Sequence, residues 1–209
     1  MKSDCCSHNA QAKSCKRKDG RTFSLPRRFS RKRCAEGVRG FTMRSSCAPY
    51  SMCGGGNQNH SGIAVLDMNG VTGTVRFEQL QDSVRIKYNI KGLTDGKHGF
   101  HIHEFGDLTD GCKNACSHFN PEGGTHGGLN SRMRHAGDLG NIVCRKGKCS
   151  GHLTAKGISL NPRQTDSIIG RSIIIHADED DLGKGGNLES IKTGNAGKRL
   201  ACAVIGISK

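Results

Sequence analysis

The chain has 209 residues, of which 32 are Lys or Arg and 18 are Asp or Glu, so its formal net charge is +14. It has no Trp, and no uninterrupted apolar run is long enough for a transmembrane helix. We therefore expect no membrane-spanning segment, and no secretory signal peptide, because no sufficiently long apolar region follows Met1.

Residues 1–60 carry much of this charge, with 13 Lys or Arg against 3 acidic residues, a net charge of +10. Their apolar residues show no period long enough to build a core, so we expect a basic, disordered extension. Three interpretations of its role stay open. An organelle transit peptide has this composition, and so do a basic arm that contacts a polyanion and a solubilising extension.

Cysteines are frequent in this extension, which holds six of the eleven in the chain: Cys5, Cys6, Cys15, Cys34, Cys47 and Cys53. None belongs to a CxxC pattern, which disfavours a zinc knuckle or a CxxC copper-handling module. The odd total argues against a complete disulfide framework. We therefore expect a reducing compartment with most thiols free, and a cytoplasmic location unless the extension directs the chain to an organelle.

Residues 61–209 are long enough for one domain with a single core. Short segments rich in Val, Ile and aromatic residues alternate with Gly, Asn and Asp, and no convincing helical stretch occurs. These segments predict eight strands at 62–70, 71–80, 83–93, 99–105, 140–149, 151–160, 170–178 and 200–208. Such a pattern favours an all-β sandwich or flattened barrel with a core of Val, Ile, Leu and a few Phe.

Residues 101–138 contain five of the ten histidines. On a strand, His101 and His103 would point to the same face, where both rings can reach one ion. A glycine-rich segment without apolar periodicity follows, and it contains His118, His126, His135 and Asp138. Three imidazoles and a carboxylate form a closed tetrahedral zinc site, and zinc can order a loop that core burial cannot.

His176 ends the apolar segment 170–178, where it can join His101, His103 and His118 in a site of four nitrogens suited to copper. Imidazole has two ring nitrogens, so a deprotonated His118 can bridge copper and zinc. Asp180 is a candidate acceptor that holds ligand histidines in the right tautomer.

Several motifs occur together in this part of the chain: GFHIHEFGD, HFNP, HGG, RHAGDLGN, DDLGKGGN, KTGNAGKRLAC and VIGI. In this order and spacing they resemble the copper/zinc superoxide dismutase family over residues 62–209. The resemblance implies an eight-stranded Greek-key β-barrel with long zinc and electrostatic loops. It also implies disproportionation of superoxide to dioxygen and hydrogen peroxide, by alternating reduction and oxidation of copper bridged to zinc through His118.

The resemblance also implies a role for each matching residue. The copper ligands are His101, His103, His118 and His176, and the zinc ligands are His118, His126, His135 and Asp138. Arg199 guides the substrate beside copper, and His118 supplies a proton. Lys192 and Thr193 line the substrate channel, Cys112 and Cys202 form a disulfide, and Phe105, Gly106 and Ile207 form the interface of a homodimer.

Two positions depart from the family pattern. Leu188 replaces one of a usual acidic pair, which leaves the channel mouth more positive. Cys116 stands where many members have glycine, and we expect it to be a small buried residue.

Two other functional classes remain as alternatives. A copper-delivery protein contains a similar domain but usually lacks part of the copper set, which is complete here. A structural or nucleic-acid-binding protein would act through its basic extension. Beyond superoxide, a second copy of the chain, a copper chaperone and a polyanion are the partners we consider.

Overall fold

The computed structural model describes residues 3–5, 13–17, 20–25, 27, 34, 47 and 60–209. The chain divides into two compact units, residues 1–58 and 59–209. Within the described residues no helix is both long and apolar enough to cross a membrane.

The described part of the first unit contains three short strands, β1 (Ser3–Asp4), β2 (Ser14–Lys16) and β3 (Thr22–Ser24), paired in the order β1-β2-β3. Disulfides join Cys5 to Cys15 and Cys34 to Cys47. The expectation of a disordered extension falls mostly on residues outside the described ones and stays a prediction.

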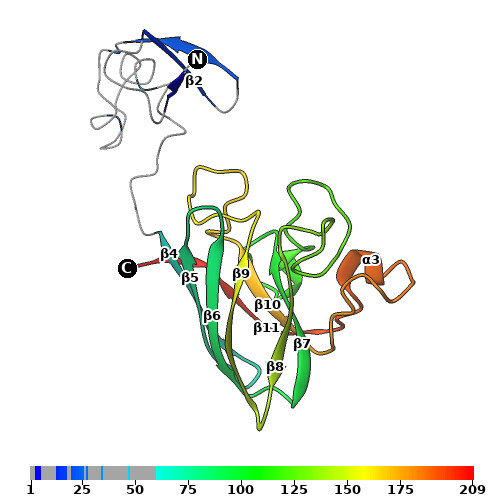
Figure 1. Cartoon of the computed structure of the whole chain (residues 1–209). Coiled ribbons are helices and arrows are strands. Elements are labelled where there is room, and N and C mark those ends of the chain that lie inside the picture. The colour runs from blue at the N-terminus through cyan, green and yellow to red at the C-terminus, as the bar shows by residue number, and fades with distance from the viewer. Residues whose placement is uncertain are drawn as a thin grey trace. The chain divides into compact units, whose positions relative to one another are not determined.

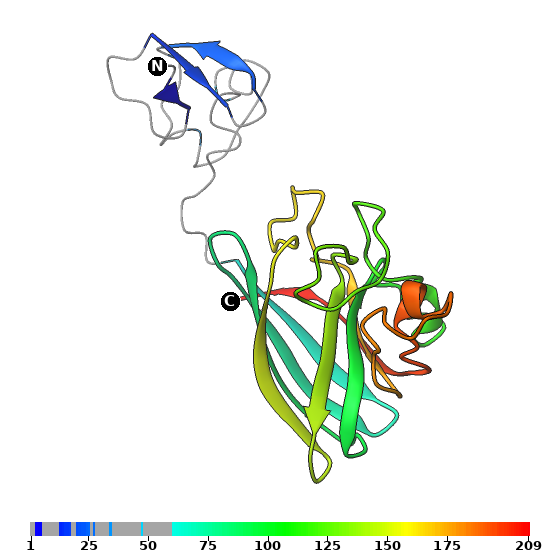
Figure 2. The same cartoon turned by 45° about the vertical axis from the view of Figure 1, so that its right-hand side comes forward.

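The second unit is a flattened barrel of two antiparallel sheets (Figures 1 and 2). One sheet has the order β11-β10-β7-β8 and the other β12-β4-β5-β6-β9. The chain changes sheet four times, between β6 and β7, between β8 and β9, between β9 and β10, and between β11 and β12. The strands are β4 (Ser61–Met68), β5 (Val71–Gln79), β6 (Val84–Lys91), β7 (Gly96–His103), β8 (Asp138–Cys144), β9 (Lys148–Ala155), β10 (Ser172–His176), β11 (Arg199–Val204) and β12 (Gly206–Ser208). The all-β barrel expected from the sequence is confirmed.

Alternation along the strands places one apolar face of each sheet in the core. In β4, for example, Ala64 and Leu66 are buried while Val65 and Asp67 are exposed. The largest fully buried side chains are Phe77, Phe100, Leu66, Leu160 and eight isoleucines. Each of these contributes about 1.5–3 kcal/mol by leaving water.

The structure corrects two of the predicted strands. Segment 140–149 is a hairpin between β8 and β9, with Lys146 and Gly147 at its turn, both at positive φ. Two-residue hairpin turns of type I′ require positive φ at both positions, but lysine is a weak signal for one. Segment 200–208 is divided into β11 and β12, which belong to different sheets.

The prediction that most thiols are free is wrong for the described residues. Besides the two disulfides of the first unit, Cys112 joins Cys202 and Cys144 joins Cys149. Cys116 is the one free cysteine in the described part of the chain. None of the four bonded pairs has CxxC spacing, so the search for that motif could not predict these disulfides.

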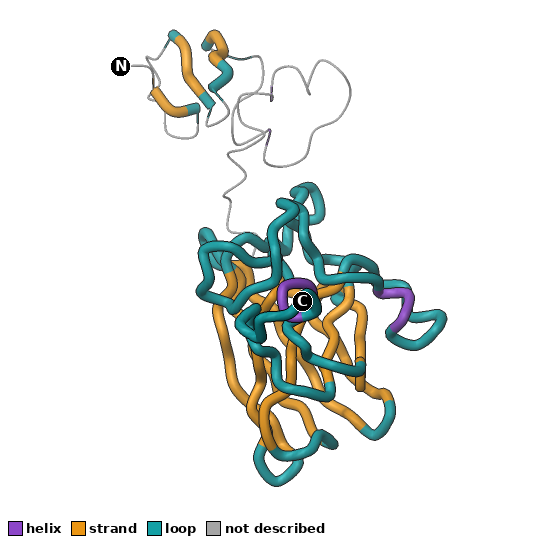
Figure 3. Tube along the Cα trace, turned by 90° about the vertical axis from the view of Figure 1, so that its right-hand side faces the viewer, coloured by secondary structure: helices purple, strands orange, loops and turns teal. Residues whose placement is uncertain are grey.

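Two long connections lie on the outside of the barrel (Figure 3). The first, residues 104–137, contains the 3₁₀ helix η2 (Lys113–Ala115). The second, residues 177–198, contains the short helix α3 (Ser190–Thr193). The two connections meet where the backbone N–H of His126 donates to the carbonyl of Ile191 at 2.9 Å. The candidate site lies between them and the β11-β10-β7-β8 sheet.

Candidate metal centre

Strand β7 brings two histidines to one face. Phe100 and Ile102 point into the core, so His101 and His103 point to the opposite face, as their spacing predicts. The pairing of β7 with β8 shifts register between Gly99 and His101. A β-bulge of this kind re-aims the side chains beside it.

Strand β10 supplies a third histidine at a second irregularity. Register with β11 shifts between Ile175 and His176, and His176 then lies opposite Arg199. A ring and a guanidinium at directly opposed positions are close neighbours. The basic side chain expected to guide an anion is therefore adjacent to a candidate ligand.

Four imidazoles converge at this point. The ring centroid of His118 lies 4.1 Å from that of His101 and 4.8 Å from that of His103. The ring of His176 lies 4.9 Å from His101 and 5.6 Å from His103. One nitrogen from each of the four buried rings lies within 4.8 Å of the others.

A second group gathers around the carboxylate of Asp138, at the start of β8. Its Oδ1 lies 2.8 Å from Nδ1 of His118, 3.0 Å from Nδ1 of His126 and 3.2 Å from Nδ1 of His135. In a tetrahedral zinc site with bonds near 2.0 Å, neighbouring ligand atoms lie roughly 3.3 Å apart. The separations in this group therefore suit a zinc ion.

Asp180 connects the two groups. Its Oδ2 accepts a hydrogen bond from Nε2 of His101 at 2.8 Å, and its Oδ1 accepts one from Nε2 of His126 at 2.7 Å. The Cα of Gly194 approaches so closely that an added Cβ would lie 2.0 Å from Asp180 Oδ1. Only glycine fits at this position, which also has φ +69°.

The ring nitrogens that face the centre are unsatisfied. In three rings one nitrogen donates to a group that can only accept. Nε2 of His101 donates to the Asp180 carboxylate, Nδ1 of His103 to the Cys116 carbonyl, and Nδ1 of His176 to the Gly197 carbonyl. A neutral imidazole has one N–H, so the other nitrogen of each ring carries a free lone pair. Among the histidine rings of the described residues, the buried nitrogens without a hydrogen-bond partner are His101 Nδ1, His103 Nε2, His118 Nε2, His126 Nδ1 and His176 Nε2.

Unpaired buried nitrogens are costly unless they bind something, and an electron-pair acceptor such as a metal ion satisfies all of them. Four nitrogens suit copper, and three nitrogens with one carboxylate oxygen suit zinc. The residues present therefore fit both metals.

Comparison with known proteins leads to the same chemistry. Residues 71–205 match the profile of the family described as copper/zinc superoxide dismutase. Superoxide dismutase [Cu-Zn] of Paramecium bursaria Chlorella virus 1 is 57% identical over 151 residues, which cover 71% of this chain and 79% of that protein. Superoxide dismutase [Cu-Zn] A of Xenopus laevis is 53% identical over 146 residues, or 69% of this chain and 95% of that one. The extracellular superoxide dismutase [Cu-Zn] of Brugia pahangi is 50% identical over 151 residues, covering 70% and 75%.

The chain belongs to the copper/zinc superoxide dismutase family. Its reaction is therefore the disproportionation of superoxide to dioxygen and hydrogen peroxide, and its metals are copper and zinc.

In this dismutase His126 differs in charge from three of the candidate copper ligands. Burial, followed by the neighbouring His118, lowers the pKa of His101 to about 3. Burial also lowers the pKa of His176 to about 4 and that of His103 well below its usual value. Their lone pairs are thus free at neutral pH. Burial alone would lower the pKa of His126, but the Asp138 and Asp180 carboxylates raise it to about 9.

Arg199 of the dismutase is held on the 112–116 loop. Its guanidinium donates to the carbonyls of Cys112 at 2.7 Å and of Lys113 at 3.2 Å, and also to the carbonyl of Cys116. After burial and His118, its charge is a further cause of the low pKa of His103. The Cys112–Cys202 disulfide, with a Cα–Cα distance of 5.8 Å, connects this loop to β11.

Lys192 and Thr193 lie on helix α3, outside the two groups of ligands. Thr193 donates to the carboxylate of Glu189 at 2.7 Å, and the Lys192 side chain is exposed. Leu188 precedes the helix and is 73% exposed.

Cys116 differs from expectation, because it is exposed and not buried. Its carbonyl faces inward to accept from His103 and Arg199, and at φ +62° its side chain points outward.

His98 lies outside both groups of candidate ligands and is buried on β7. Its Nδ1 lies 2.9 Å from the carbonyl of His176, and its Nε2 lies 3.0 Å from the carbonyl of Thr94. It therefore supports the backbone of a candidate ligand. Its position on β7, at i−3 from His101, gave no signal for this contact.

Proposed function

We propose that individual residues divide the chemistry of this dismutase as follows. His101 through Nδ1, and His103, His118 and His176 through Nε2, hold copper. His118, His126 and His135 through Nδ1, and Asp138 through Oδ1, hold zinc. The unsatisfied buried nitrogens support the copper assignment, and the convergence of three Nδ1 atoms on Asp138 Oδ1 supports the zinc assignment.

Copper, when bound, supplies the reversible one-electron change that the reaction needs, and zinc has no accessible second oxidation state. Arg199 attracts superoxide and orients it beside His176. His118, fixed through Nδ1 in the zinc group, would use Nε2 for two purposes in turn: while Nε2 does not hold copper it would take up a proton from solvent, and it would donate this proton to the reduced substrate. A second proton from solvent completes hydrogen peroxide, so two superoxide anions and two protons give one dioxygen and one peroxide.

The guiding role of Arg199 has a direct test. Arg199→Ala should lower the rate constant of dismutation and weaken its dependence on ionic strength, because steering by charge is screened by salt. Arg85→Ala, on the opposite sheet, is the control. If both variants match the parent chain at all salt concentrations, Arg199 does not guide the substrate.

We also propose that the chain forms a homodimer through the surface around Phe105, Gly106 and Ile207. Phe105 is 50% exposed and Ile207 74%, unusually high for large apolar side chains. Gly106 packs against Gly170, where an added Cβ would lie 2.2 Å from the carbonyl oxygen, and the exposed Val204 lies beside it.

Sedimentation of the metal-loaded chain tests this proposal. Ile207→Glu should shift the equilibrium toward monomer, since a buried charge opposes association. Val143→Glu, at an exposed apolar position on β8, should leave the parent dimer intact. A monomeric parent chain would contradict the proposal.

For the compartment we propose an oxidising one, in place of the cytoplasm expected from the odd number of cysteines. Four disulfides in the described residues support this, because such bonds persist mainly outside reducing compartments. Alkylation of acid-quenched native extracts, followed by peptide analysis, should find Cys144 and Cys149 oxidised. Finding them alkylated would favour the cytoplasm.

Two partners complete the proposal. The basic extension, with a net charge of +10 over residues 1–60, suits contact with a polyanion. A copper chaperone is a candidate source of the metal, and activity after expression with and without such a chaperone tests it.

A further inference from the structure

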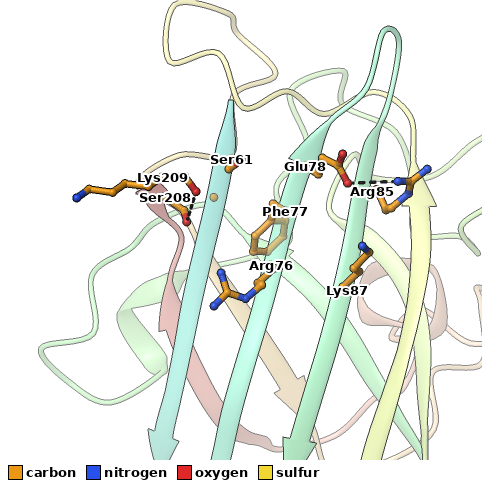
Figure 4. Close-up of a pocket in the computed structure, with 9 residues that line it drawn as sticks. Ser61, Arg76, Phe77, Glu78, Arg85, Lys87, Ser208 and Lys209 are labelled. Carbon is orange, nitrogen blue, oxygen red and sulfur yellow. Dashed lines mark hydrogen bonds and ion pairs between the residues drawn. The ribbon is translucent and has the colours of Figure 1, made fainter. Parts of the chain in front are cut away.

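A shallow pocket of about 220 Å³ lies on the outer face of the sheet that carries no candidate metal ligand. Strands β4, β5 and β6 form its floor, and β12 lies at its edge (Figure 4). Four cationic residues, Arg76, Arg85, Lys87 and Lys209, line it together with one residue that has an acidic side chain, Glu78. The pocket is therefore electropositive.

The cations of the pocket differ in their partners. Glu78 and Arg85 form an ion pair at 3.3 Å, so the only acidic side chain is already engaged. Arg76 lies directly opposite Lys87 in the β5–β6 register. Like charges at directly opposed positions destabilise a sheet. Neither side chain forms a hydrogen bond or ion pair with any residue that the structure describes, so two exposed cations share one pocket without a counter-charge.

A second pair of directly opposed cations on the same sheet serves as a comparison for Arg76 and Lys87. Lys91 lies opposite Lys148 in the register of β6 and β9, and both are exposed. No pocket residue belongs to this pair. Lys91 and Lys148 thus match Arg76 and Lys87 in charge and exposure, but they lie outside this pocket.

We propose that this pocket binds a tetrahedral oxyanion, the phosphate or sulfate group of a monoester. The guanidinium of Arg76 offers N–H donors in a planar fork that matches two oxygens of such a group, and Lys87 adds a point charge. The hydroxyl group of Ser61 offers a further donor, whereas that of Ser208 already donates to the Lys209 backbone oxygen at 3.3 Å. Phe77 is only 1% exposed and presents no face for stacking, so recognition is of the anionic group and not of an attached base.

The test uses the full chain loaded with zinc and reduced copper, followed by NMR shifts of the Arg76 and Lys87 side chains. Inorganic phosphate, inorganic sulfate and a sulfated disaccharide are titrated at constant ionic strength, so that general screening does not change. We expect saturable shifts at both residues. The probe with the highest affinity identifies the source of the anionic group.

Matched variants decide whether the pocket is responsible. Arg76→Gln with Lys87→Gln should weaken the best probe by roughly fivefold or more, since each exposed charge pair has a small effect. Lys91→Gln with Lys148→Gln should change its affinity by less than about twofold. Equal metal content and dismutation rates in all forms confirm folding. Absence of saturable shifts, or equal loss in the two double variants, would overturn the proposal.

Discussion

Single contacts decide which nitrogen of each histidine is available in this dismutase. Asp180 and the carbonyls of Cys116 and Gly197 bind the far nitrogens of three rings, which leaves the near nitrogens unprotonated. The low pKa values of His101 and His176, about 3 and 4, have the same effect on charge. The candidate copper ligands are thus ready to bind before the metal arrives.

Asp180→Asn should weaken this arrangement. Because Asp180 accepts from both His101 and His126, its loss removes a carboxylate from each group of ligands. Supporting contacts of this kind typically change metal affinity by about 10–100-fold. Competition with a chelator measures the effect, and Asp181→Asn, which alters the adjacent loop contacts to Gly183, Ser190 and Asn195, is the control. Equal affinities in the two variants would show that Asp180 does not orient the ligands.

Zinc binding to the metal-free chain should release a proton at pH 7.5, whereas copper binding alone to the metal-free chain should release none, because His118 must lose its own N–H proton only when both metals are bound. His126, with a pKa of about 9, is protonated at this pH and must lose its proton to bind zinc through Nδ1. His101 and His176 are already neutral. Calorimetry in buffers of different ionisation enthalpy counts the protons. Equal release with both metals would contradict this account.

Among the strands, shifts in pairing register lie next to two of the candidate ligands. The bulges next to His101 and His176 lie on neighbouring strands, β7 and β10. The HxH spacing predicts that His101 and His103 share a face, but no sequence pattern reveals a bulge. Likewise Asn69-Gly70 signals its hairpin turn, whereas Lys146-Gly147 does not, so the β8–β9 hairpin was taken for one strand.

The two barrel disulfides should differ in their effect on stability. Cys112–Cys202 closes 90 residues and Cys144–Cys149 only 5. In the chain-entropy estimate the longer loop stabilises by roughly 4.5 kcal/mol and the shorter by roughly 2 kcal/mol. Denaturant unfolding of metal-free Cys112→Ser/Cys202→Ser and Cys144→Ser/Cys149→Ser chains compares them. A larger loss from the shorter loop would contradict the entropic explanation.

In the whole molecule, most of the positive charge and the candidate metal ligands lie in different parts of the chain. Residues 1–60 hold +10 of the formal charge of +14, yet all proposed ligands and the core lie beyond them. The barrel could be predicted from strand alternation, and the residues that converge as candidate ligands could be predicted from motifs. The disulfides of the extension could not, because cysteines distant in the sequence carry no local signal of their pairing.

Deletion of residues 1–58 should therefore leave metal content and dismutation unchanged. The second compact unit begins at residue 59 and contains both groups of candidate ligands. Binding to an immobilised polyanion should fall in the same variant. If dismutation is lost while the barrel stays folded, the extension takes part in the reaction.

The most direct test of the shared histidine compares His118→Ala with Asp138→Ala, each measured for copper, zinc and superoxide dismutation per chain. We predict one copper and one zinc in the parent chain, near-complete loss of dismutation in His118→Ala, and a smaller loss in Asp138→Ala that retains copper. Full activity in His118→Ala, with both metals still bound, would contradict the assignment of His118 as the bridge and proton donor.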